Sequence, residues 1–218
     1  MGLAIVIGYQ ADMKENDSEG YVFSQKQFAR MAEVLEENGL GGQWAEPDSP
    51  TDFPEWEGTR PHSGDFSYSD LHYLRRAYAH TSRMRYLERD DPLEPVEQLT
   101  EEDNERVMDE TMMMSSHLLC HSDCEGYYVP VDFPEPIFDD RAPGGMLGSS
   151  FGLLRELREV APTLSITLTE EGELSDEEAA RLFAVEWGAP FGRELQMWLT
   201  LWELSRASVH LGTAIVFC

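Results

Sequence analysis

Residues 117–130, HLLCHSDCEGYYVP, carry the side chains with the clearest potential for chemistry. Two histidines, two of the three cysteines of the chain and one aspartate fall within eight positions. On a continuous helix, His117, Cys120, His121 and Cys124 would stand at i, i+3, i+4 and i+7, and therefore on one face. Four imidazole and thiolate ligands suit zinc in type and number, so a metal site is one interpretation of this stretch.

A second interpretation is a cysteine nucleophile, with Cys124 attacking, His121 as its base and Asp123 orienting the imidazole. Neither interpretation is favoured, because the spacing departs from known zinc patterns and near neighbours on a turn rarely aim at one another. Ser122 and Asp123 are residue types that bond their own backbone in tight turns, and Gly126 has an unrestricted φ. We therefore expect a rigid corner without a cofactor. A zinc- or Cys-dependent enzyme remains the alternative.

Net charge is the extreme feature of the composition. Forty-two acidic residues face sixteen basic ones, for a net charge of −26. A field of that sign repels phosphate backbones and anionic lipids, so we expect neither nucleic-acid nor membrane binding, and it attracts basic proteins. The favoured function is a non-catalytic, immunity-like or regulatory protein that binds or neutralises a basic protein partner. Trp44, Phe53 and Trp56 would be its apolar anchors, from a long acidic loop at about 41–66 rich in proline and glycine.

The compartment follows from the cysteine count and the apolar runs. Three cysteines, two of them four residues apart, argue against a disulfide framework and for a reducing cytoplasm. The apolar runs are far shorter than the roughly 18 residues of a membrane span, and the N-terminus lacks a secretory signal. The sequence leaves the oligomeric state open.

Hydrophobic periodicity and capping signals predict the elements that must position these residues. They indicate one helix-rich α+β domain over residues 1–218, with a small sheet that includes the N- and C-terminal strands. The expected strands are 3–9, an edge strand at 126–133 and 213–218, with a short strand and turn after 163. The expected helices are 24–38, 69–85, 100–114, 149–160, 175–187 and 190–210, with a polar loop at 12–21.

Two charged and apolar patterns lie before the central motif. The arginines of helix 69–85 are expected on its outer side, paired with the acidic tract from Glu88 to Glu110. Met108 and the run Met112 to Met114 are expected to fill the core, with an adaptable binding surface as the alternative.

The motif and the chain end together resemble a family of small uncharacterised bacterial proteins. That family carries an HSDC-x-G motif and closes on an A-x-x-x-G-x-x-[IV]-x-F strand. The resemblance supports a bacterial origin and the fold, and it implies no activity. The matching positions are His121, Ser122, Asp123, Cys124, Gly126, Ala207, Gly212, Ile215 and Phe217.

Overall fold

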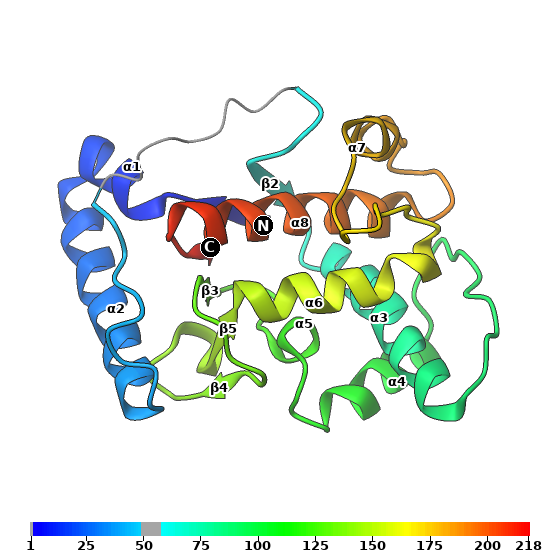
Figure 1. Ribbon diagram of the computed structural model, residues 1–218, viewed down its shortest axis with the longest axis horizontal. Helices are drawn as coiled ribbons and strands as arrows, with labels where there is room; N and C mark the ends of the chain where they lie inside the picture. The colour runs from blue at the N-terminus through cyan, green and yellow to red at the C-terminus, as the bar shows by residue number, and fades with distance from the viewer. Residues whose placement is uncertain (1, 49–57) are drawn as a thin grey trace.

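A computed structural model describes residues 2–48 and 58–218 (Figure 1). The strands are β1 (Leu3–Ile7), β2 (Ser63–Phe66), β3 (Gly126–Val129), β4 (Ile137–Phe138), β5 (Met146–Ser149) and β6 (Ile215–Phe217). The helices are α1 (Tyr9–Asn16), α2 (Ser18–Glu37), α3 (Asp70–Leu87), α4 (Glu101–Thr111), α5 (His117–Cys120), α6 (Ser150–Val160), α7 (Asp176–Phe183) and α8 (Gly192–Leu211). The predicted α+β class is confirmed.

The six strands form one sheet in the order β2-β1-β6-β3-β5-β4. Neighbouring strands are antiparallel except for β3 and β5, which are parallel. The two terminal strands, β1 and β6, pair directly, with Val6 opposite Val216. The prediction that both chain ends join one sheet is therefore confirmed.

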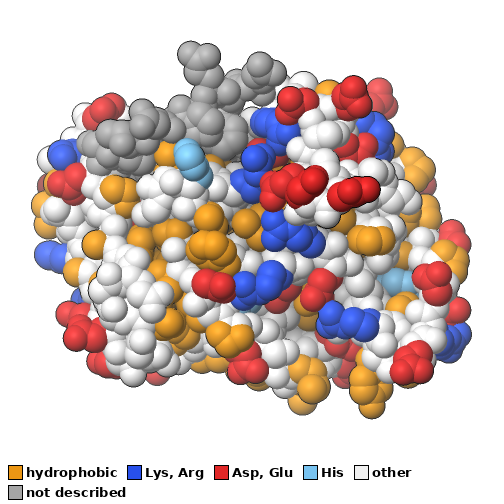
Figure 2. Space-filling view, viewed as in Figure 1, with side chains coloured by type: hydrophobic (Ala, Val, Ile, Leu, Met, Phe, Trp, Pro, Cys, Tyr) orange, Lys and Arg blue, Asp and Glu red, His pale blue; other side chains and the backbone are white. Residues whose placement is uncertain are grey.

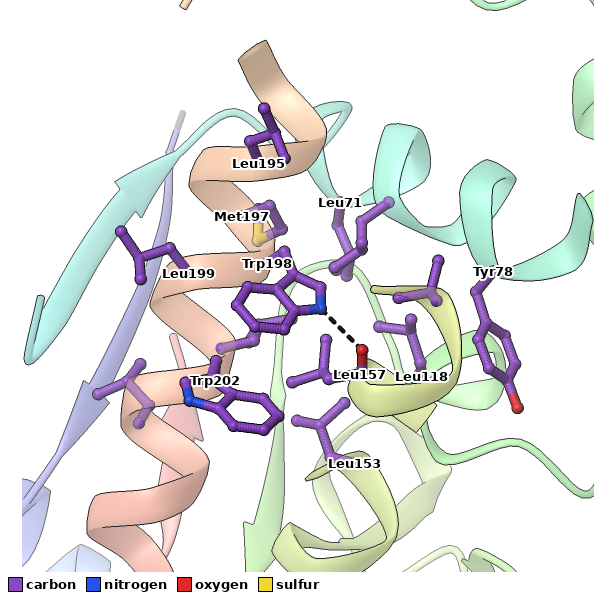
Figure 3. Close-up of a cluster of buried hydrophobic side chains, with 14 of the residues drawn as sticks. Leu71, Tyr78, Leu118, Leu153, Leu157, Leu195, Met197, Trp198, Leu199 and Trp202 are labelled. Carbon is purple, nitrogen blue, oxygen red and sulfur yellow. Dashed lines mark hydrogen bonds between the residues drawn. The ribbon is translucent and has the colours of Figure 1, made fainter. Parts of the chain in front are cut away.

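Alternating side chains of the central strands build a separate core on each face of the sheet. Tyr128 and Phe217 point to a face covered by α3, α6 and α8, whereas Tyr127 and Val216 point to the face covered by α2. This period of two is what a strand buried on both faces requires. On the larger side, Trp198 of α8 donates an indole hydrogen bond to the Leu157 carbonyl at 2.8 Å, within a dense cluster of leucines (Figure 3).

Three expected boundaries are wrong, each for a local reason. The stretch 12–21 contains the end of α1 and the start of α2; between them Asp17 is extended and caps α2 by accepting hydrogen bonds from the backbone amides of Glu19 and Gly20. The strand at 126 is interior, since all four of its residues are buried between β6 and β5 and Pro130 follows after its last residue. The predicted loop at 41–66 ends in β2, which pairs with β1.

Helix α4 begins at a capping box and is held against α3. The Thr100 hydroxyl accepts from the Asp103 amide, and the Asp103 carboxylate accepts from the Thr100 amide. Asp103 also accepts a hydrogen bond from Arg76 Nε at 2.8 Å, with both side chains buried.

Arg75 and Arg76 were expected on the outer side of α3. Both are buried, because each ties an adjoining segment to the helix. No helix among the described residues is long and apolar enough to cross a bilayer.

Candidate functional site

His117 lies at the start of α5 with its ring inside the protein. Its Nδ1 accepts a hydrogen bond from the Ser149 amide at 3.1 Å, and its carbonyl accepts one from the Tyr128 hydroxyl. Burial lowers the pKa of His117 to about 4, so the ring is neutral at physiological pH. The side chain thus ties α5 to β3 and to the start of α6.

His121 is buried in an aromatic stack. Its ring lies parallel to that of Tyr128, with centroids 4.4 Å apart, and it also packs on Phe217. The Nδ1 atom donates to the Ser122 carbonyl at 2.8 Å, and burial lowers the pKa of His121 to about 3. Gly126 permits this packing, because a Cβ there would lie 2.7 Å from His121 Nε2. His121 is therefore placed as a packing residue of the larger core.

Asp123 turns away from His121 and meets α3. It accepts hydrogen bonds from Arg75 and from His72 Nε2, the latter at 2.9 Å. Despite partial burial, these partners hold the pKa of Asp123 at about 2, so it is a carboxylate. Arg75 also donates to the carbonyls of Leu118 and His121, so one guanidinium holds both sides of the turn. Sequence reasoning missed His72 and Arg75, because they lie about 50 residues away.

The two cysteines of the motif do not converge on its histidines. Cys120 is half-buried, which raises its thiol pKa, and it contacts the Thr111 carbonyl at 3.9 Å. Cys124 is exposed, with its sulfur 3.5 Å from the Ser122 hydroxyl. Within residues 2–48 and 58–218, no three His, Cys, Asp or Glu side chains are grouped to hold a metal ion. This geometry is that of a corner which locks α5, β3 and α3 together.

Of the three expected aromatic anchors, only Trp44 falls within the described residues. Its ring is buried and packs edge-on against Phe28, with centroids 5.9 Å apart, and its Nε1 donates to the Gly212 carbonyl at 3.1 Å. Trp44 therefore fastens residues 41–48 to the body and leaves little ring for a partner. Phe53 and Trp56 lie outside the described residues.

The acidic tract, residues 88–110, is the most strongly charged segment of the chain. Eleven of its 23 residues are acidic and two are arginines. Only part of this charge is consumed internally: Asp103 pairs with Arg76, and Asp91 and Glu102 pair with the arginines inside the tract. The members that are exposed and lack an ion pair among the described residues are Glu88, Asp90, Glu94, Glu97, Glu101, Glu105 and Asp109.

Internal ion pairing is more complete around α7. Figure 2 shows carboxylates over the whole visible face, with arginine or lysine side chains beside those over α7. There Glu178 pairs with Arg181, and Asp176 with Arg60. The expected pairing of the α3 arginines with the acidic tract is limited to Arg76, because Arg75 and Arg85 pair with Asp123 and Glu159 instead. The tract therefore keeps a net negative surface.

A family model described as "Putative DNA-mimic protein" matches residues 1–217. Neither a curated protein nor a solved structure matches the chain. The match supports a resemblance to a protein family and extends it over nearly the whole chain; it does not bear on the HSDC-x-G and closing-strand motifs.

This match corrects two expectations drawn from the charge. The expected function, an immunity-like or regulatory protein that neutralises a basic protein, is wrong. The expectation that nucleic acid plays no part in its interactions is wrong as well. The physical reason is common to both. A negative surface repels phosphate, but it also resembles the phosphate backbone in charge, so it can be recognised by proteins that bind DNA.

Proposed function

The chain belongs to the family described as "Putative DNA-mimic protein", and we propose that it occupies the DNA-binding surface of a DNA-binding protein in place of DNA. The observation that carries this proposal is the family match over residues 1–217. The acidic tract supports it, because it presents carboxylates that the protein's own arginines leave unpaired. We further propose that the chain acts as a single α+β domain in a bacterial cytoplasm.

The spacing of carboxylates on α4 supports the tract as the imitating surface. Glu101, Glu105 and Asp109 recur every four residues, which is about 6 Å along a helix axis. One strand of duplex DNA carries a phosphate charge about every 3.4 Å of its axis. The helix alone therefore has about half the linear charge of one strand, and the exposed acids of 88–97 add to it.

The position of these charges is fixed, which favours binding. The capping box sets the first turn of α4, and the buried pair of Asp103 with Arg76 joins the helix to α3. A pre-ordered set of charges loses less conformational freedom on association than a flexible acidic tail. It also steers a basic surface toward one orientation, with a rate that falls as salt rises.

The proposal is tested by competition with duplex DNA. We suggest a panel of purified DNA-binding proteins: a histone octamer, a helix-turn-helix repressor, an HU-type nucleoid protein, an HMG-box domain and the TATA-binding protein. Each is bound to a fluorescent duplex of about 30 base pairs, and release of the duplex is followed as this protein is added. We expect release from at least one of them, weakening as salt rises. Release from none, or release indifferent to salt, contradicts the proposal.

A matched pair of variants locates the activity. The tract variant carries Glu101→Gln, Glu105→Gln and Asp109→Asn, and we expect it to need at least tenfold more protein for the same release. The control variant removes the same charge from α1 and α2, through Glu15→Gln, Glu33→Gln and Glu36→Gln, and we expect little change. Equal losses would show that net charge, and not the tract, is recognised.

A further inference from the structure

An apolar patch lies at the C-terminal end of the acidic tract. Met108, Met112 and Met113 are 67%, 73% and 72% exposed, and Tyr86 at the end of α3 is 86% exposed. Figure 2 shows hydrophobic side chains projecting at the lower right, where Figure 1 places α4. The expectation that these methionines fill the core is wrong, because the inward side of α4 is used by Asp103 and Val107. Clustered apolar exposure of this kind marks an interaction site.

Met113 and Tyr86 line a groove of about 490 Å³. Its walls come from the end of α3, the end of α4 and the start of α5, and its buried apolar lining comes from Tyr78 and Leu119. The carboxylates of Asp109 and Glu110 line the same groove, and so does Arg85, whose charge is paired with Glu159. The groove therefore joins an apolar interior to an anionic border.

That combination matches the chemistry of one class of DNA-binding surface. Proteins that bend or kink DNA insert an apolar side chain between base pairs while basic residues hold the flanking phosphates. A gap between base pairs is an apolar slot bordered by negative charge. The groove beside Asp109 and Glu110 offers the same pair of features, with the flexible side chain of Met113 to adapt to the shape inserted.

We propose that the groove between Tyr86 and Met113 receives the apolar wedge of a DNA-bending protein, so that the preferred partner belongs to that class. This inference rests on the proposed function, since it assigns the kind of DNA-binding protein that is imitated. Charge complementarity favours such an occupant, because its wedge is surrounded by cations. A second copy of this chain would bring Asp109 and Glu110 close to carboxylates of the same sign, and an anionic lipid surface would be repelled in the same way.

The test uses the same panel of DNA-binding proteins, divided by whether they insert an apolar side chain between base pairs. The HU-type protein, the HMG-box domain and the TATA-binding protein insert apolar wedges, whereas the histone octamer does not. Binding of each to wild-type protein and to a Tyr86→Ser, Met113→Gln variant is measured by calorimetry at several salt concentrations. Phe23→Gln is the control, because Phe23 is exposed on α2 at the other end of the molecule. Both sites are exposed, so all variants should keep the wild-type melting temperature.

We expect the groove variant to bind at least one wedge protein about tenfold or more weakly, with the salt slope unchanged. Alanine in place of the partner's wedge should give a similar loss, and Phe23→Gln should give none. The inference is overturned if no wedge protein binds, or if the groove variant binds them as the wild type does. It is also overturned if the histone octamer loses as much affinity. If the wild-type protein still releases duplex DNA in a salt-dependent way in those cases, the proposed function stands without this inference; if it releases none, both fail.

Discussion

Asp103 holds the acidic tract to the body of the protein, although it is itself hidden from any partner. Its Oδ1 accepts from Arg76 Nε at 2.8 Å, and its Oδ2 accepts from the amide and hydroxyl of Thr100 at 3.0 and 2.7 Å. Arg76 also donates to the Glu94 carbonyl at 2.7 Å, so the same guanidinium fixes the segment before α4. We predict that Asp103→Ala detaches the tract without removing any exposed charge.

The magnitude follows from the charge left behind. Removing one partner of a buried ion pair costs about 3–5 kcal/mol, because the other charge stays out of water without compensation. Arg76 retains only the Glu94 carbonyl and a distant carboxylate, Glu194, at 3.8 Å. Loss of the helix cap adds about 1 kcal/mol. Replacing Arg76 by methionine in the same chain removes the uncompensated charge, so we expect Arg76→Met to recover part of the loss.

Urea unfolding of the two single variants and the double variant gives the free energies directly. Amide hydrogen exchange over residues 101–111 reports whether the loss is local, and duplex release reports whether function follows. We expect faster exchange in α4 and weaker release for Asp103→Ala, although its exposed charge is unchanged. A cost below about 1 kcal/mol, or a double variant no more stable than Asp103→Ala, would refute the reasoning.

Other predictions concern the residues that hold the fold around the tract. Burial raises the pKa of Glu156 to about 7, above its ordinary 4.5, so the ionised form is penalised in the folded state. The Glu156 contribution to stability should therefore fall by about 3 kcal/mol as pH rises from about 4.5 to 7, and urea unfolding of Glu156→Gln should lack that component. Trp44→Phe should cost more than about 1 kcal/mol in urea unfolding, because the hydrogen bond to the Gly212 carbonyl and part of the buried indole packing are both lost. Gly126→Ala should lower the melting temperature strongly, since φ is +141° and the new Cβ would meet His121, whereas Gly188→Ala, which has open space, should not.

The sequence predicted those features that depend on near neighbours. The capping signals of helix 100–114 and the apolar run of the C-terminal strand involve residues a few positions apart, and a capped helix and a strand are present there. The corner at residues 121–126 was also expected, because Ser, Asp and Gly favour turns through their own backbones. Its stabilising partners were not, since Arg75 and His72 reach it from another helix.

Burial of charged and apolar side chains was harder to predict. The sequence around Arg76 does not distinguish it from an exposed helical arginine. Its burial is favourable only because the carboxylate of Asp103 lies beside it in the fold. Met112 and Met113 are of a residue type that usually fills the core. They are exposed here because α4 ends at Thr111, before their side chains can reach the interior. The candidate surface was therefore missed on two counts: its acids were expected to be neutralised and its methionines to be buried.

The buried arginines and the unpaired acidic residues at the surface are related features of this fold. Arg60, Arg75 and Arg76 have largely buried side chains, and each joins segments far apart in sequence through a carboxylate and a backbone carbonyl. A planar, always-charged guanidinium suits this use better than an ammonium, which accords with fourteen arginines and only two lysines in the chain. Because these cations act as internal clamps, they are not spread over the surface to offset its acids. More than half of the acidic residues that the structure describes have no ion pair, and the same pairing that stabilises α4 leaves its outer face anionic. The anionic outer face of α4 thus follows from the excess of 42 acidic over 16 basic residues and from the burial of Arg76 beneath the helix.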